Sequence, residues 1–378
     1  MEYKSLKDIA QIVMGQSPDS ASYNDNCDGL PFFQGNADFG EVYPTERVWC
    51  NDPKKTAEPG DILISVRAPI GALNYAKDKC CIGRGLAAIR IDDEAERNYV
   101  FHLLKARNTD LNNKGTGSTF KAIGKNVLEE LAVPQIPRDE QQKCMDMMDL
   151  LESIIRERKN QIRKLDELIK ARFVELFGDP EINPMNWPEQ PLSERLDVLG
   201  GYAFKSENFD EESGIPVLRI GNVNSGRFKP VNMVYWNEDA SLERYAIYPG
   251  DLVMSLTGTV GKDDYGNVCI LGNDYNKYYL NQRNAKLEIK EGLDKYYLSQ
   301  LLKFECIKKR LTGISRGVRQ ANIANKDILN LIVPIPPIEK QKSYSEFVEE
   351  VDKSKTAVQK SLDKTQVLFD SLMQEYFG

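Results

Sequence analysis

The sequence has almost no histidine and no long hydrophobic run. His102 is the only histidine among 378 residues, so a histidine-based metal site or a Ser-His-Asp relay would have to be built around it alone. It lies in the amphipathic stretch NYVFHLLKAR, which favours a role in helix packing. No apolar run approaches the ~20 residues that a membrane span needs. The start, MEYKSLKDIAQ, shows no signal peptide. These absences predict a cytoplasmic protein without membrane association.

Several catalytic and structural motifs are also missing. The seven cysteines form no CxxC, and the one close pair, Cys80-Cys81, is adjacent, which argues against structural zinc and a secreted disulfide framework. We expect reduced thiols. The sequence contains no GxxxxGK[ST], no GxGxxG and no NPPY-like or DPPY-like element of an amino-methyltransferase. A nucleotide site of these common types is therefore not predicted.

The charge balance excludes one class of nucleic-acid binder. The net charge is −7, with 41% hydrophobic and 28% charged residues, a composition typical of a soluble globular protein. A uniformly basic protein is excluded, but a locally basic surface is not, because the field depends on where the charges lie.

The chain is a duplicated unit. LKDIAQIVMG (6–15) aligns with LSERLDVLGG (192–201), and PGDILISVRAPIG (59–71) aligns with PGDLVMSLTGTVG (249–261). The clearest match is GSTFKAIGKNVLEELAVPQIPRDEQ (117–141) with GVRQANIANKDILNLIVPIPPIEKQ (317–341). The spacing rises steadily along the chain, as expected for two copies of one fold with loop insertions in the second.

Each copy divides into a mixed part and a long helix. Short β-like runs follow the PGD turns, whereas 139–177 and 339–377 are free of Pro and Gly, and these helix breakers flank them. Apolar residues step by three and four along both segments, from Met148 to Leu176 and from Val351 to Tyr376, which predicts a coiled-coil seam. At 1.5 Å per residue each helix is roughly 58 Å long. Separate surface helices are the alternative.

These patterns predict an α+β, mixed architecture: two repeated α/β domains joined by two long antiparallel coiled-coil helices, with an approximate two-fold axis. The predicted segments are 1–137 for the first mixed domain, 138–178 for the central helix, 179–337 for the second mixed domain and 338–378 for the C-terminal helix.

Two basic windows lie at equivalent positions of this acidic chain. Residues 103–126 carry a net charge of +4 and residues 303–326 a net charge of +6, and each window contains a Gly-rich polar loop. Backbone N–H groups, hydroxyls and cations can contact phosphate, and Arg and Gln can contact base edges. A solvated helix followed by a turn is the alternative interpretation. The candidate residues in these loops are Lys114, Thr116, Ser118, Thr119, Lys121, Arg316, Arg319 and Gln320.

Weaker candidates lie outside the two windows, near predicted strand ends. Each alone is more often a solvent-facing residue. They are Arg67, Arg84, Arg219, Asn222, Thr257, Thr259, Lys262, Gln282 and Arg283.

One nuclease-like pattern is present. Asp274 precedes Glu288-Ile289-Lys290, and a carboxylate followed by ExK can hold Mg²⁺ near a phosphate. The pattern is short, and the first copy carries Arg90 and Asp92 at the matching positions. A stand-alone Mg²⁺-dependent nuclease is therefore a minor alternative.

The layout resembles the specificity subunit of type I restriction-modification enzymes, over the whole chain. The resemblance rests on the two PGD strands, on Val-Pro followed by Pro and Gln (133–141 and 333–341), and on the closing sequences ARFVELFG (171–178) and SLMQEYFG (371–378). Each motif alone is weak, but their order and duplication are specific. IEKQ (338–341) departs from the family, whose members often have an acidic residue before the Gln.

The resemblance implies a function without catalysis. Each mixed domain would be a target recognition domain reading one half of a bipartite, asymmetric double-stranded DNA target. The helices would set the spacer and dock two modification (methyltransferase) subunits, which restriction (endonuclease and translocase) subunits join. The chain would bind no cofactor, since S-adenosylmethionine, ATP and Mg²⁺ belong to the partners. A coiled-coil adaptor whose mixed domains bind proteins is the other alternative.

Overall fold

The fold consists of two compact units. A computed structural model of the chain describes residues 2–117, 121–223, 225–259, 262, 264–313 and 320–377. Unit 1 comprises Met1–Lys159 with Gln359–Gly378, and unit 2 comprises Asn160–Val358. The two long helices are thus each shared between the units, whereas the sequence predicts them as segments of their own.

In its described residues, unit 1 has two sheets, a short strand pair and three short α-helices. The larger sheets have the strand orders β2-β10-β7-β8 and β3-β5-β4-β9-β6, and β1 pairs with β11. The elements are β1 (Glu2–Ser5), β2 (Gln11–Met14), β3 (Tyr23–Asn24), β4 (Leu30–Phe33), β5 (Trp49–Cys50), β6 (Thr56–Ala57), β7 (Ile62–Ser65), β8 (Leu73–Tyr75), β9 (Cys80–Ile82), β10 (Leu86–Arg90), α1 (Glu94–Ala106), α2 (Asn108–Asn113), α3 (Lys125–Glu129) and β11 (Ala132–Gln135).

Unit 2 repeats this plan. Its sheets have the orders β13-β21-β17-β19 and β15-β14-β20-β16, and the pairs β12-β23 and β18-β22 complete it. The elements are β12 (Glu189–Pro191), β13 (Leu196–Gly200), β14 (Ile215–Leu218), β15 (Val234–Trp236), β16 (Ala246–Ile247), β17 (Leu252–Ser255), β18 (Thr257–Thr259), β19 (Val268–Ile270), β20 (Tyr278–Leu280), β21 (Asn284–Ile289), α5 (Lys295–Leu301), α6 (Glu305–Thr312), β22 (Gln320–Asn322), α7 (Asn325–Leu329) and β23 (Ile332–Pro334).

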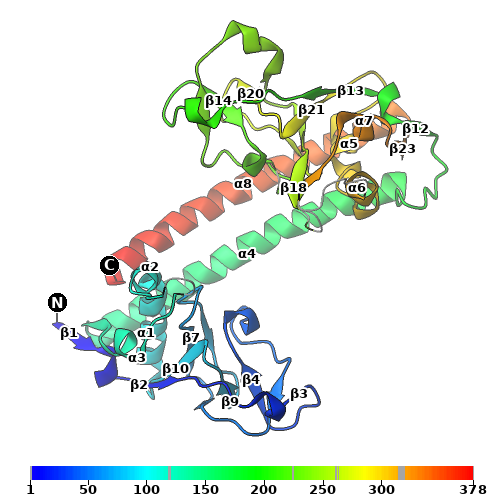
Figure 1. Cartoon of the computed structure of the whole chain (residues 1–378). Helices are drawn as coiled ribbons and strands as arrows, with labels where there is room; N and C mark the ends of the chain where they lie inside the picture. Colours follow the sequence, from blue (N-terminus) through cyan, green and yellow to red (C-terminus); the bar gives the residue numbers. More distant parts are fainter. Residues whose placement is uncertain are drawn as a thin grey trace. The chain divides into compact units, whose positions relative to one another are not determined.

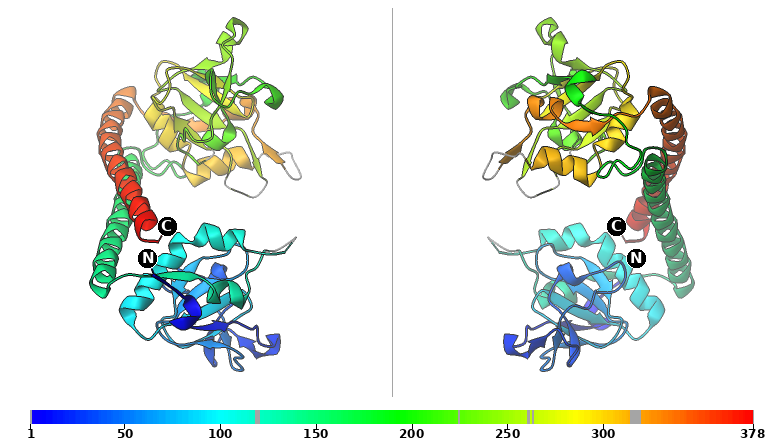
Figure 2. Two further views of the ribbon diagram at one scale, coloured as in Figure 1. Left: turned by 90° about the vertical axis from the view of Figure 1, so that its left-hand side faces the viewer. Right: turned by 90° about the vertical axis from the view of Figure 1, so that its right-hand side faces the viewer.

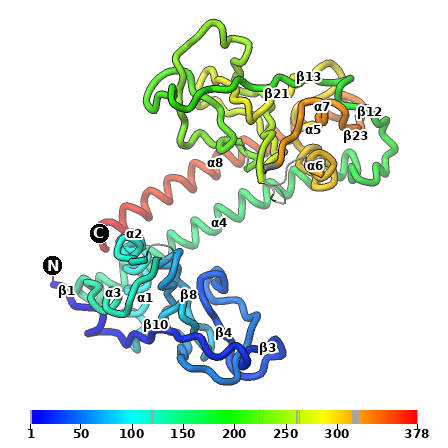
Figure 3. Tube along the Cα trace, in the orientation of Figure 1, coloured from blue at the N-terminus to red at the C-terminus, as the bar shows by residue number. Residues whose placement is uncertain are grey.

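The strand pairing confirms the duplication. In each unit the strand after the PGD turn lies between two antiparallel neighbours, β10 and β8 in unit 1 and β21 and β19 in unit 2. Each unit also contains one parallel pair, β4 with β9 and β14 with β20. The chain path can be followed in Figure 3. The two copies therefore share a topology as well as sequence blocks.

The PGD turns form as their residues predict. Gly60 and Gly250 have φ values of 86° and 87°, a region that favours glycine. The Asp61 carboxylate accepts a 2.8 Å hydrogen bond from the Glu58 N–H, and Asp251 accepts one of 2.8 Å from the Tyr248 N–H. Each aspartate thus closes the turn that starts a buried strand.

The Val-Pro segments close each mixed domain onto its own beginning. β11, which contains Val133 and Pro134, pairs antiparallel with β1, and β23 pairs antiparallel with β12. The Leu6 N–H donates to the Leu131 carbonyl at 2.9 Å, and the equivalent bond from Leu192 to Leu331 measures 3.0 Å. The motif therefore joins the two ends of the domain just before the long helix begins.

The long helices are α4 (Arg138–Phe177) and α8 (Ile338–Phe377), drawn in Figure 1 in green and red. They pack side by side in antiparallel order. In unit 2, Lys355 Nζ lies 2.8 Å from the Asp166 carboxylate, and the Tyr344 hydroxyl donates to the Ile169 carbonyl at 3.3 Å. The predicted antiparallel pair is confirmed, and Lys355, which interrupts the apolar seam, has an ion-pair partner across it.

The seam predicted from spacing is wrong by one residue at each helix end. Leu176 and Tyr376 are half-buried, whereas Phe177 and Phe377 are buried. Phe177 packs on Tyr297, and Phe377 packs on Tyr99. The reason is that the last turn of each helix packs on a mixed domain, and Phe177 also packs on Tyr344 of α8.

The position of the single histidine agrees with its predicted role in helix packing. His102 is buried on α1, with its Nε2 atom 3.5 Å from the Asp149 carboxylate of α4. All seven cysteines are free thiols. Among the described residues, no helix is long and apolar enough to cross a membrane.

Candidate nucleic-acid interface

Three loops of unit 1 meet where strand β7 ends. The Val66 N–H donates to the Gly85 carbonyl at 2.8 Å, and the Ile123 N–H donates to the Val66 carbonyl at 2.9 Å. The Ala68 N–H donates to the Lys121 carbonyl at 3.0 Å. The structure thus brings together the segments that carry Arg67, Arg84 and the Gly-rich loop, which are widely separated in sequence.

Arg67 and Arg84 line one pocket of unit 1, together with Gln34, Gly35, Asn36, Ala68 and Gly85. Both arginine side chains are exposed. Within the described part of the chain, neither guanidinium has a carboxylate in ion-pair contact. Two unpaired cations beside two amide side chains form a surface rich in hydrogen-bond donors.

The Gly-rich loop of unit 1 is closed by its own strand-like pair. Thr116 and Ala122 exchange two backbone hydrogen bonds of 3.0 and 2.9 Å. Lys114, Thr116 and Lys121 are exposed. The candidates Ser118 and Thr119 lie outside the described residues.

The helical cations of this window are neutralised. Lys105 pairs with Glu152, Arg107 lies 3.3 Å from Asp110, and Lys125 lies 2.9 Å from Glu129. Ion pairing therefore reduces the charge that the window offers to a ligand. The loop lysines account for most of what remains.

Unit 2 repeats the convergence of loops. The Leu256 N–H donates to the Arg283 carbonyl at 2.8 Å, and β18 pairs antiparallel with β22, which places Thr259 opposite Gln320. Lys262, Gln282 and Arg283 are exposed, and Thr257 is half-buried. Arg316 and Arg319 lie outside the described residues, as does the side chain of Gln320.

Asn222, one of the predicted contacts in unit 2, has a structural role. Asn222 is 3% exposed, and its amide nitrogen donates to the Lys229 and Val231 carbonyls at 2.9 and 3.0 Å. Its amide oxygen accepts from the Arg219 N–H at 3.0 Å. With donor and acceptor both engaged, Asn222 holds a loop and is not available to DNA. The Arg219 guanidinium donates to the Asn232 carbonyl at 2.6 Å, and its other N–H groups have no partner among the residues that the structure describes.

Thr259 is also engaged within its own loop. Its N–H and hydroxyl donate to the Asp264 carboxylate at 2.8 and 3.0 Å. These hydrogen bonds hold the pKa of Asp264 below its usual value. Because an anionic carboxylate lies against the hydroxyl, a phosphate contact by Thr259 is disfavoured, and the prediction for this residue is corrected.

The nuclease-like residues do not form a metal site. Lys290 pairs with Asp197 at 2.6 Å, and Glu288 lies 3.6 Å from Lys286. Among the described residues, the one group of three potential metal ligands contains neither Asp274 nor Glu288. The ExK residues therefore serve as ordinary ion pairs on the sheet surface.

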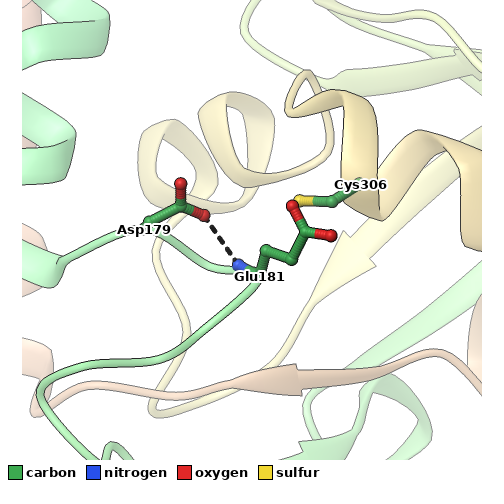
Figure 4. Close-up of side chains that lie close together, drawn as sticks. All are labelled: Asp179, Glu181 and Cys306. Carbon is green, nitrogen blue, oxygen red and sulfur yellow. Dashed lines mark hydrogen bonds between the residues drawn. The ribbon is translucent and has the colours of Figure 1, made fainter.

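That one group is Asp179, Glu181 and Cys306 of unit 2, shown in Figure 4. Asp179 and Glu181 are exposed, and an Asp179 carboxylate oxygen accepts a 2.8 Å hydrogen bond from the Glu181 N–H. Burial raises the pKa of the Cys306 thiol, which works against the thiolate that a metal requires. The cluster is best explained as a turn after α4.

Sequence reasoning missed Gln34 and Asn36, the amide residues of the pocket. They lie in the block GLPFFQGN that aligns with GIPVLRIGN of the second copy. The signal available in the sequence was that one repeated position carries Gln34 in the first copy and Arg219 in the second.

A family model described as "Type I restriction modification DNA specificity domain" matches residues 1–164 and 184–366. The putative type I restriction enzyme MjaX specificity subunit of Methanocaldococcus jannaschii is 44% identical over 163 residues, which cover 42% of the chain and 38% of that protein. The MjaVIII specificity subunit of the same organism is 28% identical over 272 residues, 67% of the chain and 63% of that protein. These matches thus span less than two thirds of either relative.

Solved structures with the same fold cover the chain from end to end. The S subunit of a type I restriction-modification system from M. genitalium superposes with a TM-score of 0.59 at 15% identity, covering 100% of the chain and 96% of that subunit. A chain from a structure of type I R-M complex assembly gives 0.54 at 17% identity, covering 100% and 97%. At these identities the likeness concerns the fold.

Proposed function

The chain belongs to the type I restriction-modification DNA specificity family, and from this premise we propose that it is the subunit that selects the DNA sequence for such a complex. Each unit would bind one half of a bipartite target in double-stranded DNA. The chain itself would carry no catalysis, and S-adenosylmethionine, ATP and Mg²⁺ would be bound by its partners.

The observation that carries this proposal is the repetition of one exposed, cationic loop cluster. In both units the strand after the PGD turn is joined by backbone hydrogen bonds to the same two loops, at Val66 and at Leu256. Exposed cations and amides follow these bonds, Arg67 and Arg84 in the first unit and Gln282 and Arg283 in the second. A protein with two equivalent binding surfaces suits two half-sites on a duplex. Because the side chains differ, the half-sites should differ in sequence.

The long helices offer a surface for the partners. Exposed apolar side chains lie on both helices, where a solitary pair of helices would carry polar ones. In unit 1 they are Met147, Leu150, Val367 and Leu368, and in unit 2 they are Leu168 and Val174. We propose that two modification (methyltransferase) subunits dock on these exposed side chains and that restriction (endonuclease and translocase) subunits join the complex.

The test is to co-express the chain with a candidate modification subunit and to map methylated bases on genomic DNA. We expect a split, asymmetric motif that disappears when the chain is omitted. A second co-expression, with Leu150 and Leu168 both replaced by Asp, should prevent complex formation and abolish the motif.

A different result would favour the protein-binding adaptor. In that case the chain would form a soluble complex with its partners, yet the complex would show no DNA affinity and no methylated motif. Mg²⁺-dependent cleavage of DNA by the purified chain would instead contradict its non-catalytic role.

A further inference from the structure

The turn between β9 and β10 and the turn between β20 and β21 have equivalent backbone hydrogen bonds, but they carry different side chains. The Leu86 N–H donates to the Gly83 carbonyl at 3.0 Å, and the Asn284 N–H donates to the Asn281 carbonyl at 2.9 Å. Val66 and Leu256 bind these turns through equal bonds of 2.8 Å to Gly85 and Arg283. The strand registers make position 84 of the first copy equivalent to 282 of the second, and position 85 equivalent to 283.

The side chains at these positions differ between the two copies. Arg67 of the first unit corresponds to Thr257 of the second, and Arg84 corresponds to Gln282. Gly85 corresponds to Arg283, and Gln34, at the end of β4, corresponds to Arg219 at the end of β14. The two copies thus have the same backbone hydrogen bonds but different hydrogen-bonding side chains. This is the arrangement expected if the two units bind different half-sites, because side chains contact the base edges.

The pocket of unit 1 presents arginines, which suit one particular base. Its lining contains the two exposed arginines and no carboxylate among the described residues. Guanine O6 and N7 accept two hydrogen bonds from one arginine, whereas the Gln34 and Asn36 amides of the same lining suit the N6 and N7 atoms of adenine. Gly35 and Gly85 add no side chain to the lining.

Both arginines also stand on a fixed backbone. Arg67 forms an antiparallel bridge with Ala122, and the Arg84 N–H donates to the Ser17 hydroxyl at 3.3 Å. A side chain on an anchored backbone loses less freedom on binding than one on a loose loop.

We propose that positions 67 and 84 are base-reading positions of the first unit and that the half-site of this unit contains a guanine contacted by Arg67 or Arg84. The inference rests on the proposed function and deepens it, since it assigns a base to one unit and names the residues that read it.

The experiment uses the chain assembled with its modification subunit. Arg67→Thr and Arg84→Gln each introduce the residue that the second unit carries at the equivalent position. Lys79→Ala is the control, because it removes one cation of the same unit from an exposed ion pair with Glu58 at 2.8 Å, outside the pocket. Binding is measured on duplex oligonucleotides that carry the wild-type motif or every single-base change in it, together with the methylated motif in cells.

We expect at least one arginine variant to relax discrimination at one guanine of one half-site by about 10- to 100-fold, with the other half-site unchanged. Unaltered thermal unfolding would show that the variants fold. Full discrimination in both variants would overturn the inference. A uniform loss on every sequence with a shallower salt dependence would also overturn it, since that result identifies phosphate contacts. A wild-type complex without any split motif would instead overturn the proposed function, and this inference with it.

Discussion

The ring of Phe177 lies edge-on against the ring of Tyr297, with the ring centroids 4.9 Å apart. Phe177 ends the helix that follows the first mixed domain, yet it is buried in the core of unit 2. The equivalent residue of the second copy, Phe377, packs on Tyr99 of unit 1, with centroids 5.1 Å apart. Each unit is therefore completed by the end of the helix that belongs to the other copy of the repeat.

This exchange predicts which unit a helix-end substitution will destabilise. Phe177→Ala should cost unit 2 about 3–5 kcal/mol, because it leaves a cavity among buried rings, and Phe377→Ala should cost unit 1 a similar amount. Hydrogen exchange resolved by peptide, combined with urea unfolding, measures the two units separately.

The matched control for Phe177 is Val174→Ala on the same helix. Val174 is 39% exposed, so its truncation should change the free energy of unfolding by less than about 1 kcal/mol. If Phe177→Ala weakened unit 1 and left unit 2 intact, the exchanged packing would be wrong.

Much of this architecture follows from local sequence. The breaker-free segments predict two long helices, and the structure places them at Arg138–Phe177 and Ile338–Phe377, directly after Pro137 and Pro337, which favour a helix start. The PGD turns are local in the same sense. Their residue types set the backbone irrespective of distant contacts.

The pocket could not be predicted in this way. It combines Gln34, Arg67 and Arg84 from three segments that meet only through long-range strand pairing, β4 with β9 and β10 with β7. Asn222 shows the opposite failure. A polar residue in a loop predicts a ligand contact, but Asn222 is buried and its three hydrogen bonds stabilise the loop itself.

The second prediction concerns the glutamine that follows each Val-Pro segment. Gln341 is fully buried, donates to the Pro336 carbonyl at 2.7 Å and accepts from the Asp294 N–H at 2.9 Å. Gln341→Ala leaves buried polar groups unpaired and should lower the free energy of unfolding by about 2–3 kcal/mol.

Gln141, its equivalent in the first copy, is half-buried and makes no side-chain hydrogen bond within the described parts of the chain. Gln141→Ala should therefore cost less than about 1 kcal/mol, as measured by urea unfolding. Equal losses for the two glutamines would show that the contacts of Gln341 add nothing to stability.

The third prediction concerns the thiols. Burial raises the pKa of Cys80, Cys81 and Cys269 each to about 12. In the unfolded chain a thiol ionises near pH 8.5, so above about pH 9 the folded state holds more protons than the unfolded state. The free energy of unfolding then falls as pH rises, by up to about 1.4 kcal/mol per pH unit for each thiol.

Cys269→Ala tests this prediction. The difference in unfolding free energy between the wild type and this variant should be constant below about pH 8 and should shrink as pH rises towards 11. Thiol labelling of the folded protein at pH 8 provides an independent check, with rapid reaction expected at the exposed Cys27 and slow reaction at Cys269 and the other buried thiols. A pH-independent difference would mean that Cys269 is solvated in the folded protein.

The last prediction separates two lysines of one basic window. Lys121 is exposed, has no carboxylate partner among the described residues, and lies where its carbonyl is bound by the Ala68 N–H at 3.0 Å. Lys125 is four residues away and forms an ion pair with Glu129 at 2.9 Å.

If Lys121 contacts phosphate, Lys121→Ala should weaken binding of the assembled complex to all DNA sequences alike and reduce the slope of log K against log salt by about 0.9. Lys125→Ala removes the same charge from a cation that is already paired, so its slope should match the wild type. Binding isotherms at several salt concentrations, on target and non-target duplexes, measure both slopes. Equal slopes for all three proteins would remove Lys121 from the interface, whereas a loss confined to the target duplex would identify it as a base contact.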